Sequence, residues 1–285
     1  MWIRQVCYQL STLLVVVLLG GFLGATLVWL APGRSTDERE LDARLSEESI
    51  QAIRELRESD KSVVEFYVAY MRAVFTGNLG VSQSLNRPVL ELLSERLPVT
   101  LFSVGTGLAL GWSAALSLAL LASVSDRFLP GFLLTVFSAG LLCIPMAGLA
   151  LICLFLGAPG FYAIALVVFS RVFRYLVDVL QVTRSQSHVL AASARGLGRI
   201  RILFWHMAPI VLPQVLALAG TSASLALSAA IPMEVICDSA GIGQLVWQAA
   251  LGRDLPLLVN LTLLVTLMTH LTNLASDLAI AAWRA

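Results

Sequence analysis

The sequence predicts an all-α protein that crosses a membrane six times. Hydrophobic residues make up 58% of its 285 residues and charged residues only 13%, and the mean hydropathy is +0.84. A soluble domain is about half apolar and about a quarter charged. Six apolar stretches are each long enough to cross a hydrocarbon core of about 30 Å as a helix rising about 1.5 Å per residue. These observations together predict a polytopic membrane protein.

The first apolar stretch runs from Gln9 to Leu30 and follows Arg4. Its uncharged run is longer than the apolar core of about 7–15 residues in a secretory signal. We therefore predict a retained N-terminal membrane helix within residues 1–31, with the N-terminus inside.

Residues 32–97 differ in composition, because they contain many charged residues of both signs. Ser35 and Glu38 form a capping-box pattern. Apolar residues then recur at helical spacing, with a break at residues 77–80. We predict an extracytoplasmic helical segment between the first and second spans.

Residues 98–285 form the predicted membrane core. Six spans place both termini on one side of the membrane. Arg4, Arg127 and Arg284 then share that side with the arginines between spans four and five, and the positive-inside rule identifies it as the cytoplasm. The remaining spans are predicted at about residues 99–124, 128–156, 161–180, 207–231 and 257–281.

The cytoplasmic loop at residues 184–206 contains arginines and no acidic residue. The small residues Ala191 and Ala192 allow another protein to approach a helix closely. Gly196 can end that helix, because glycine accepts the left-handed conformation of a C-terminal cap. On these grounds two interpretations stay open, a knob that docks in a partner and an ordinary basic loop. The arginines are Arg184, Arg195, Arg199 and Arg201.

No nucleotide-binding loop is present, because such a loop needs Gly-Lys-Ser/Thr and the single lysine, Lys61, follows Asp60. If ATP is hydrolysed at such a loop, the loop must therefore belong to another chain. We expect no catalytic residue and no cofactor in this chain. The cysteines and the three histidines have no metal-ligand spacing, so no metal site is predicted. The cysteines, Cys7, Cys143, Cys153 and Cys237, are interpreted as small hydrophobic residues.

Polar residues recur at helical spacing in the last two predicted spans. They fit either the lining of a translocation path or the small and polar packing that membrane helices use. Both interpretations stay open. The residues are Thr221, Ser224 and Ser228 in span five, and Thr262, Thr266, Thr269, Asn273 and Ser276 in span six.

Charged residues occur near the middle of span four and at the outer end of span five. Arg171 and Arg174 suggest a translocation-path site for a substrate carboxylate, because intramembrane charges usually face the bundle interior. The alternatives are an internal ion pair of Arg174 with Asp178, or a span that is placed several residues too deep in the membrane. Glu234 and Asp238 are candidates for contact with a partner protein or a cationic substrate group, with a solvated rim as the alternative.

The loop resembles the coupling loop of binding-protein-dependent ABC-importer permeases, with the pattern Glu-Ala-Ala, three residues, Gly. Ala191, Ala192 and Gly196 match, and His206 matches the dipeptide/oligopeptide/nickel branch. Leu190 replaces the glutamate and Trp205 the arginine that usually precedes the histidine. Residues 75–82 and 87–98 resemble the same branch. Three motifs nearer the C-terminus resemble it as well: Glu-Val-Ile at 234–236, Gly-Ile-Gly at 241–243 and Arg-Asp-Leu-Pro at 253–256. Ala240 stands where the branch usually has a proline before Gly-Ile-Gly.

This resemblance implies a type I ABC-importer permease that forms half of the pathway for a peptide-like or related small solute. It implies a second, similar permease, two ATP-binding subunits and an extracytoplasmic binding protein as partners, in a bacterial or archaeal plasma membrane. Residues 184–206 would dock in the ATPase, with Ala191, Ala192, Gly196, Arg199 and His206 as coupling residues. A stand-alone secondary transporter is the alternative, with Asp178 and Asp277 as its few intramembrane carboxylates; a membrane enzyme lacks a supporting cluster.

Overall fold

The structure is a computed structural model, and it describes residues 79–82, 84–124 and 128–283 together with a few isolated residues nearer the N-terminus. Most of the first predicted span and of the extracytoplasmic segment therefore lies outside the described residues. The described part is helical apart from turns and one isolated antiparallel bridge between Val81 and Pro88.

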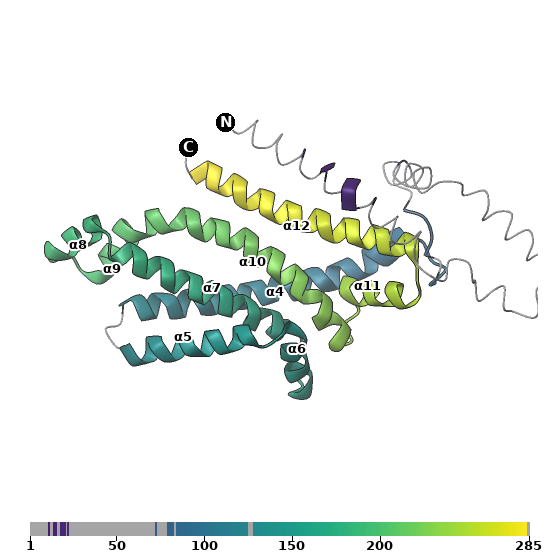
Figure 1. Ribbon diagram of the computed structural model, residues 1–285, viewed down its shortest axis with the longest axis horizontal. Coiled ribbons are helices and arrows are strands. Elements are labelled where there is room, and N and C mark those ends of the chain that lie inside the picture. The colour runs from purple at the N-terminus through teal and green to yellow at the C-terminus, as the bar shows by residue number, and fades with distance from the viewer. Residues whose placement is uncertain are drawn as a thin grey trace, which may run out of the picture. The chain divides into compact units, whose positions relative to one another are not determined.

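The helices follow one another with short connections (Figure 1). They are α4 Val89–Val124, α5 Phe128–Cys143, α6 Met146–Phe155, α7 Phe161–Arg184, α8 Ser187–Ala194, α9 Arg199–Ile202, the π-helix η1 Leu203–Met207, α10 Ala208–Ile236, α11 Ile242–Leu251 and α12 Leu255–Trp283.

Three described helical stretches are long and apolar enough to cross a membrane, Val89–Ser123, Arg199–Ile236 and Pro256–Trp283. A fourth candidate combines α5 and α6 as one bent span. In the part of the chain that the structure describes, this finding confirms a helical architecture with several apolar helices of membrane-spanning length. The fourth predicted span is a helix, α7, but it is outside this group, and the charged residues Arg171, Arg174 and Asp178 interrupt its apolar run.

The third predicted span, residues 128–156, differs from a single straight helix. It bends by 101° between Cys143 and Met146, where Pro145 has an extended backbone conformation before α6. A proline has no N–H to continue the helical hydrogen bonds, which explains the break. After α6, Gly157 adopts a φ of +65° and leads into α7 through the tight turn that residues 157–160 predict.

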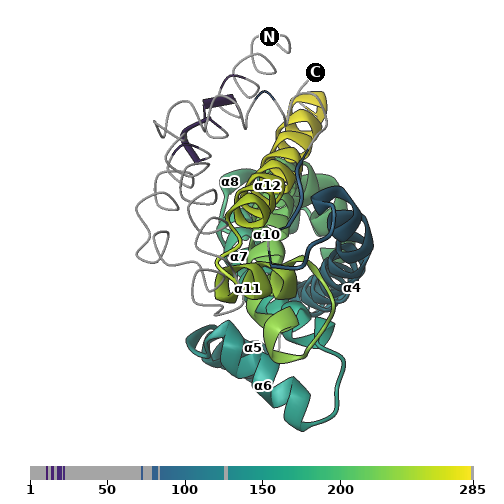
Figure 2. The same cartoon turned by 90° about the vertical axis from the view of Figure 1, so that its right-hand side faces the viewer.

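The described residues divide into two compact units, one with residues 79–93 and 248–267, the other with residues 94–247 and 268–283. The core of the second unit centres on α7, which packs against α5, α6 and α10 (Figure 2). Val168 and Phe173 of α7 are fully buried. Gly107 and Gly111 of α4 face α7 so closely that a Cβ would come within 2.7–2.9 Å of Ile164 and Val168. Glycines permit this close approach of membrane helices.

The first unit contains a polar junction centred on the buried Asp254. Its carboxylate accepts hydrogen bonds from Ser82 Oγ (2.5 Å), Ser84 N (2.9 Å) and, through the other oxygen, Leu257 N (3.1 Å). The last bond caps the N-terminus of α12. Asn260 Nδ2 donates to the carbonyl of Leu79 at 3.0 Å. Two segments far apart in sequence are thereby joined through buried polar groups.

Candidate functional site

The segment from Ser187 to Met207 folds as a compact knob, hereafter the 187–207 knob, which lies at one end of α7 and α10 (Figure 1). Its first helix, α8, ends at Gly196 with a φ of +76°. The amide of Gly196 donates to Ser193 O at 3.0 Å and that of Leu197 to Ala192 O at 3.4 Å. This is the Schellman pattern, which requires the left-handed conformation that glycine adopts at little cost.

The second half of the 187–207 knob is irregular. The four-residue helix α9 leads into the π-helix η1, which joins α10. Pro209, near the start of α10, has no N–H to donate to the carbonyl of Trp205, four residues earlier. A π-turn at this point accommodates the lost hydrogen bond, and such turns occur frequently at functional sites.

The inner side of the knob is part of the hydrophobic core around α7 and α10. Val189 and Ala192 of α8 are buried, and so are Leu203 and Met207 of η1. The backbone of the knob is thus held by packing as well as by the glycine cap. His206 is half-buried, and its Nδ1 is buried without a hydrogen-bond partner among the described residues.

The outer side of the knob carries large exposed apolar side chains. Trp205 is 77% exposed and Ile200 is 63% exposed, with Phe204 and Leu190 beside them in the same segment. Exposed guanidinium groups accompany them: Arg184, Arg195, Arg199 and Arg201. A tryptophan, other apolar groups and arginines form the composition that is enriched where one protein binds another.

The structure assigns the predicted coupling residues to different sides of the knob. Ala191 and Arg199 are exposed, whereas Ala192 faces the core. Gly196 is exposed and sets the end of α8. Ile200 and Phe204 are exposed in the same segment but were not among the residues predicted from the sequence, although apolar residues in a basic loop were a usable signal.

A second buried polar group lies where α10 meets α11. Glu234 has no exposed surface, and its Oε2 accepts a hydrogen bond from the amide of Gly243 at 2.6 Å. Thr100 Oγ1 of α4 accepts from the neighbouring amide of Ile242 at 2.8 Å. The N-terminus of α11 is therefore capped by two side chains from other helices.

Both glycines of the Gly-Ile-Gly motif are required by this arrangement. A Cβ on Gly241 would overlap the carboxylate of Glu234, and one on Gly243 would lie 2.5 Å from Ile231 Cα. Glu234 is thus an interior residue rather than part of an exposed rim. Asp238 is exposed, adopts a φ of +50° and accepts a hydrogen bond from Gln244 Nε2 at 2.5 Å.

The polar residues of α10 and α12 divide into two groups. Ser224 Oγ donates to Asn273 Oδ1 at 3.3 Å, and Ser276 Oγ donates to the carbonyl of Leu216. A Cβ on Gly220 would lie 2.6 Å from that of Ser276. These groups join α10 to the C-terminal part of α12, as helix-packing residues do. Thr221, Ser228 and Thr262 are exposed, and Thr266 and Thr269 are half-buried.

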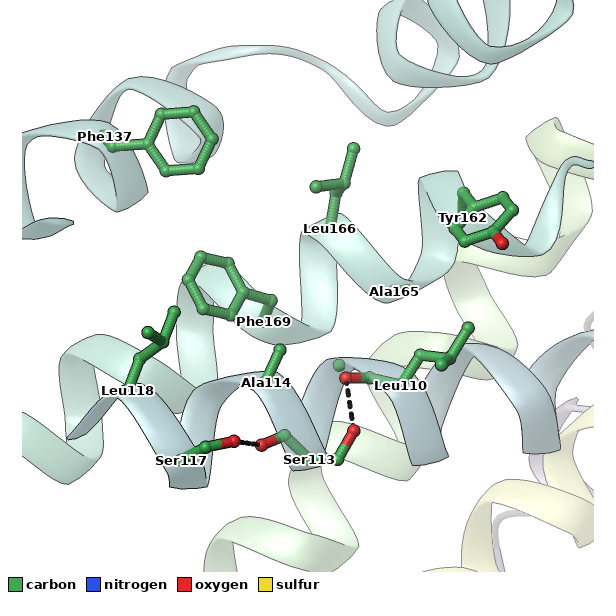
Figure 3. Close-up of a pocket in the computed structure, with 11 residues that line it drawn as sticks. Leu110, Ser113, Ala114, Ser117, Leu118, Phe137, Tyr162, Ala165, Leu166 and Phe169 are labelled. Carbon is green, nitrogen blue, oxygen red and sulfur yellow. Dashed lines mark hydrogen bonds between the residues drawn. The ribbon is translucent and has the colours of Figure 1, made fainter. Parts of the chain in front are cut away.

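An apolar cavity of about 480 Å³ lies between α4, α5 and α7 (Figure 3). Phe137, Leu166 and Phe169 contribute to its wall. The hydroxyl groups of Ser113 and Ser117 donate to carbonyls of their own helix instead of remaining available to a polar ligand. Among the described residues no group of three His, Cys, Asp or Glu residues could hold a metal ion.

Several described helices that are long and apolar enough to cross a membrane are typical of a multi-pass membrane protein. The chain belongs to the family described as the binding-protein-dependent transport system inner membrane component, whose model matches residues 107–283. It is thus the permease component of an ABC importer, and the resemblance to the peptide and nickel branch is confirmed.

Relatives of known sequence cover nearly the whole chain. A probable peptide ABC transporter permease of Sinorhizobium fredii is 27% identical over 298 residues, covering 94% of each chain. A putative peptide permease of Brucella ovis is 26% identical over 285 residues, covering 90% of this chain and 89% of its own. A nickel import system permease of Staphylococcus aureus is 25% identical over 294 residues, covering 97% and 89%.

One solved structure supports the fold. A chain of the methionine ABC transporter MetNI in an inward-facing conformation matches with a TM-score of 0.60 at 16% identity, covering 68% of this chain and 97% of its own. The structures therefore share the permease fold.

Proposed function

We propose that this permease subunit forms half of an ATP-driven import pathway and receives energy from a separate ATPase through the 187–207 knob. The observation that carries the proposal is the knob itself, whose inner side is packed into the core while Trp205, Ile200 and Phe204 are exposed. A rigid projection of this kind suits a groove on a partner, which would use the apolar side chains as anchors. Ala191, Gly196, Arg199 and His206 lie within this segment, and Ala192 supports it from inside.

The complex would contain a second permease, two ATP-binding subunits and an extracytoplasmic binding protein, with both termini of this chain in the cytoplasm. The solute would be a peptide or a nickel chelate, since the relatives are named as peptide and nickel permeases. Asp238, at the exposed α10–α11 turn, is the candidate contact for the binding protein. Glu234 would serve this contact by fixing the turn from inside.

The exposed polar residues are the candidates for the translocation path: Arg171, Arg174, Thr221, Ser228 and Thr262. Thr266 and Thr269 extend the α12 series. Ser224 and Asn273 would contribute mainly by holding α10 to α12, because their side chains bond to each other.

The knob is tested by Trp205→Ala in the complete complex, with ATP-driven uptake and co-purification of the ATPase as measurements. Removal of an anchoring tryptophan at a protein interface costs about 2 kcal/mol or more, so we expect a loss of ATPase binding of at least tenfold. Trp247→Ala removes another exposed tryptophan, on α11, and is the matched control. Full ATPase binding and full uptake by Trp205→Ala would refute the coupling role of the knob.

A stand-alone secondary transporter is the competing function. It predicts uptake by this chain alone in liposomes, driven by a proton gradient and independent of ATP. Asp178 on α7 is an exposed carboxylate that such a mechanism could use.

A further inference from the structure

The C-terminal half of α7 has two different faces. Val172, Phe173 and Leu176 are buried in the core. Arg171, Arg174 and Asp178 are exposed, and their spacing of three and four residues aligns them along one side of the helix.

The charges on the exposed face are not neutralised within the described residues. The side chains of Arg171, Arg174 and Asp178 have no ion pair or hydrogen bond with any other described residue. Arg174 and Asp178 are four residues apart on one helix, a spacing that permits a pair, yet none forms. The face therefore presents two guanidinium groups and one carboxylate, a net charge of +1.

In the proposed import fold α7 is the fourth membrane span, although its charged residues keep it outside the helices that qualify by apolar length, and contact of Arg171 with lipid would then be unfavourable. Arg171 lies ten residues after the start of α7 and thirteen before its end, which corresponds to about 15 Å and about 20 Å along the helix. Arginine at the centre of a membrane helix is costly and usually faces a bundle interior or a water-filled cavity. The face thus requires water, a protein or an anionic ligand beside it.

The backbone that carries these arginines is held firmly. Ser170, next to Arg171, is fully buried, and its hydroxyl donates to Leu166 O at 2.6 Å. Val172 and Phe173 have no exposed surface. A fixed backbone reduces the entropy lost on binding, and a guanidinium matches the two oxygens of a carboxylate in a forked geometry.

We propose that Arg171 and Arg174 bind a carboxylate group of the transported solute on its way through the membrane and so favour anionic solutes. This inference rests on the proposed import function and adds the charge of the substrate to it. The carboxylate has two possible sources, the C-terminus of a peptide and the acid groups of a metal chelator. Asp178 lies where it would repel a second negative charge on the same face.

The test uses the complete complex in proteoliposomes. The binding protein is added on the extracytoplasmic side of the complex, and ATP is supplied on the side of the ATP-binding subunits. For the peptide source, the probes are N-acetyl-trialanine, which carries one carboxylate, and its C-terminal amide, which is neutral. For the chelate source, they are nickel citrate and the neutral complex bis(dimethylglyoximato)nickel. For each variant, the uptake of the acid probe is divided by the uptake of the neutral probe, and this ratio is compared with that of the wild-type complex. The binding protein is the same in both complexes, so its own selectivity cancels in the comparison. The variants are Arg171→Gln, Arg174→Gln and Arg171→Lys.

We expect the glutamine variants to lower the acid-to-neutral ratio about tenfold, equal to about 1.4 kcal/mol, for the source that the complex carries. Arg171→Lys should recover part of the ratio, because it keeps the charge but loses the fork. Asp178→Asn, on the same face, should leave the ratio unchanged or raise it.

Equal losses for acid and neutral probes, or an unchanged ratio, would overturn the proposal. Loss of the second permease from the purified Arg171→Gln complex would overturn it too, since the arginines would then pair with that subunit. Import of the neutral probes alone by the wild-type complex refutes the carboxylate site but leaves ATP-driven import intact. A wild-type complex that imports no probe and whose ATPase does not respond to the binding protein refutes the proposed function itself.

Discussion

Replacement of Glu234 by alanine tests the α10–α11 junction most directly. The change removes the acceptor for the Gly243 amide, which lies 2.6 Å from Oε2, in an environment where Glu234 has no exposed surface. Removing the acceptor leaves the buried Gly243 amide unpaired, which costs about 1–3 kcal/mol, and the cavity left by the buried side chain adds to the loss. We therefore expect the free energy of unfolding to fall by about 3 kcal/mol.

Thermal unfolding of the purified protein in detergent measures this change, followed as loss of the monodisperse peak in size-exclusion chromatography. A loss of about 3 kcal/mol corresponds to a decrease of about 6–12 °C in Tm for a chain of roughly this size. Glu234→Gln keeps an oxygen that can accept from Gly243 and should lower Tm by less than half as much. Thr100→Val removes the acceptor for Ile242 and the hydroxyl that interacts with the Glu234 carboxyl group, and should cost about 1 kcal/mol. A Tm of Glu234→Ala within 2 °C of the wild type would show that the cap does not stabilise the junction.

Three further predictions are checked by thermal unfolding, by ATP-driven uptake and by limited proteolysis. Gly111→Val should destabilise by about 1–3 kcal/mol, because a Cβ there lies 2.8 Å from Ala165 O, whereas Gly105→Val has open space and should have little effect. Gly196→Ala should lower the free energy of unfolding by about 1 kcal/mol and reduce ATP-driven uptake, because the backbone φ at Gly196 is +76°. Gly198→Ala is the control and should behave as the wild type, because φ there is −64° and a Cβ would meet open space. Asp254→Ala should increase proteolysis within residues 80–88 at least fivefold, because it removes three hydrogen bonds to Ser82 and Ser84; an unchanged cleavage rate would argue against the junction.

Local signals in the sequence were reliable where a single residue determines the backbone. Gly196 predicted the end of α8, and residues 157–160 predicted the turn before α7. The bend at Pro145 was missed because the apolar run continues across it, although a proline within a predicted span was a visible warning.

Interactions between distant segments were not accessible from the sequence. The sequence around Glu234 does not show that its side chain turns inward to cap α11. The second capping side chain, Thr100, belongs to α4, which is far away in the sequence. The polar residues of α10 and α12 matched two interpretations, and the Ser224–Asn273 hydrogen bond assigns those two to helix packing. The inward side of Ala192 likewise depends on the core around α7.

The packing of the 187–207 knob has a mechanical consequence. Its buried side chains, including Val189, Leu203 and Met207, belong to the same close-packed interior as α7 and α10, and such interiors have low compressibility. A load applied at the exposed indole of Trp205 is therefore not absorbed by local bending. We expect such a load to displace α7 and α10 together, and bending within the permease to occur in other parts of the chain.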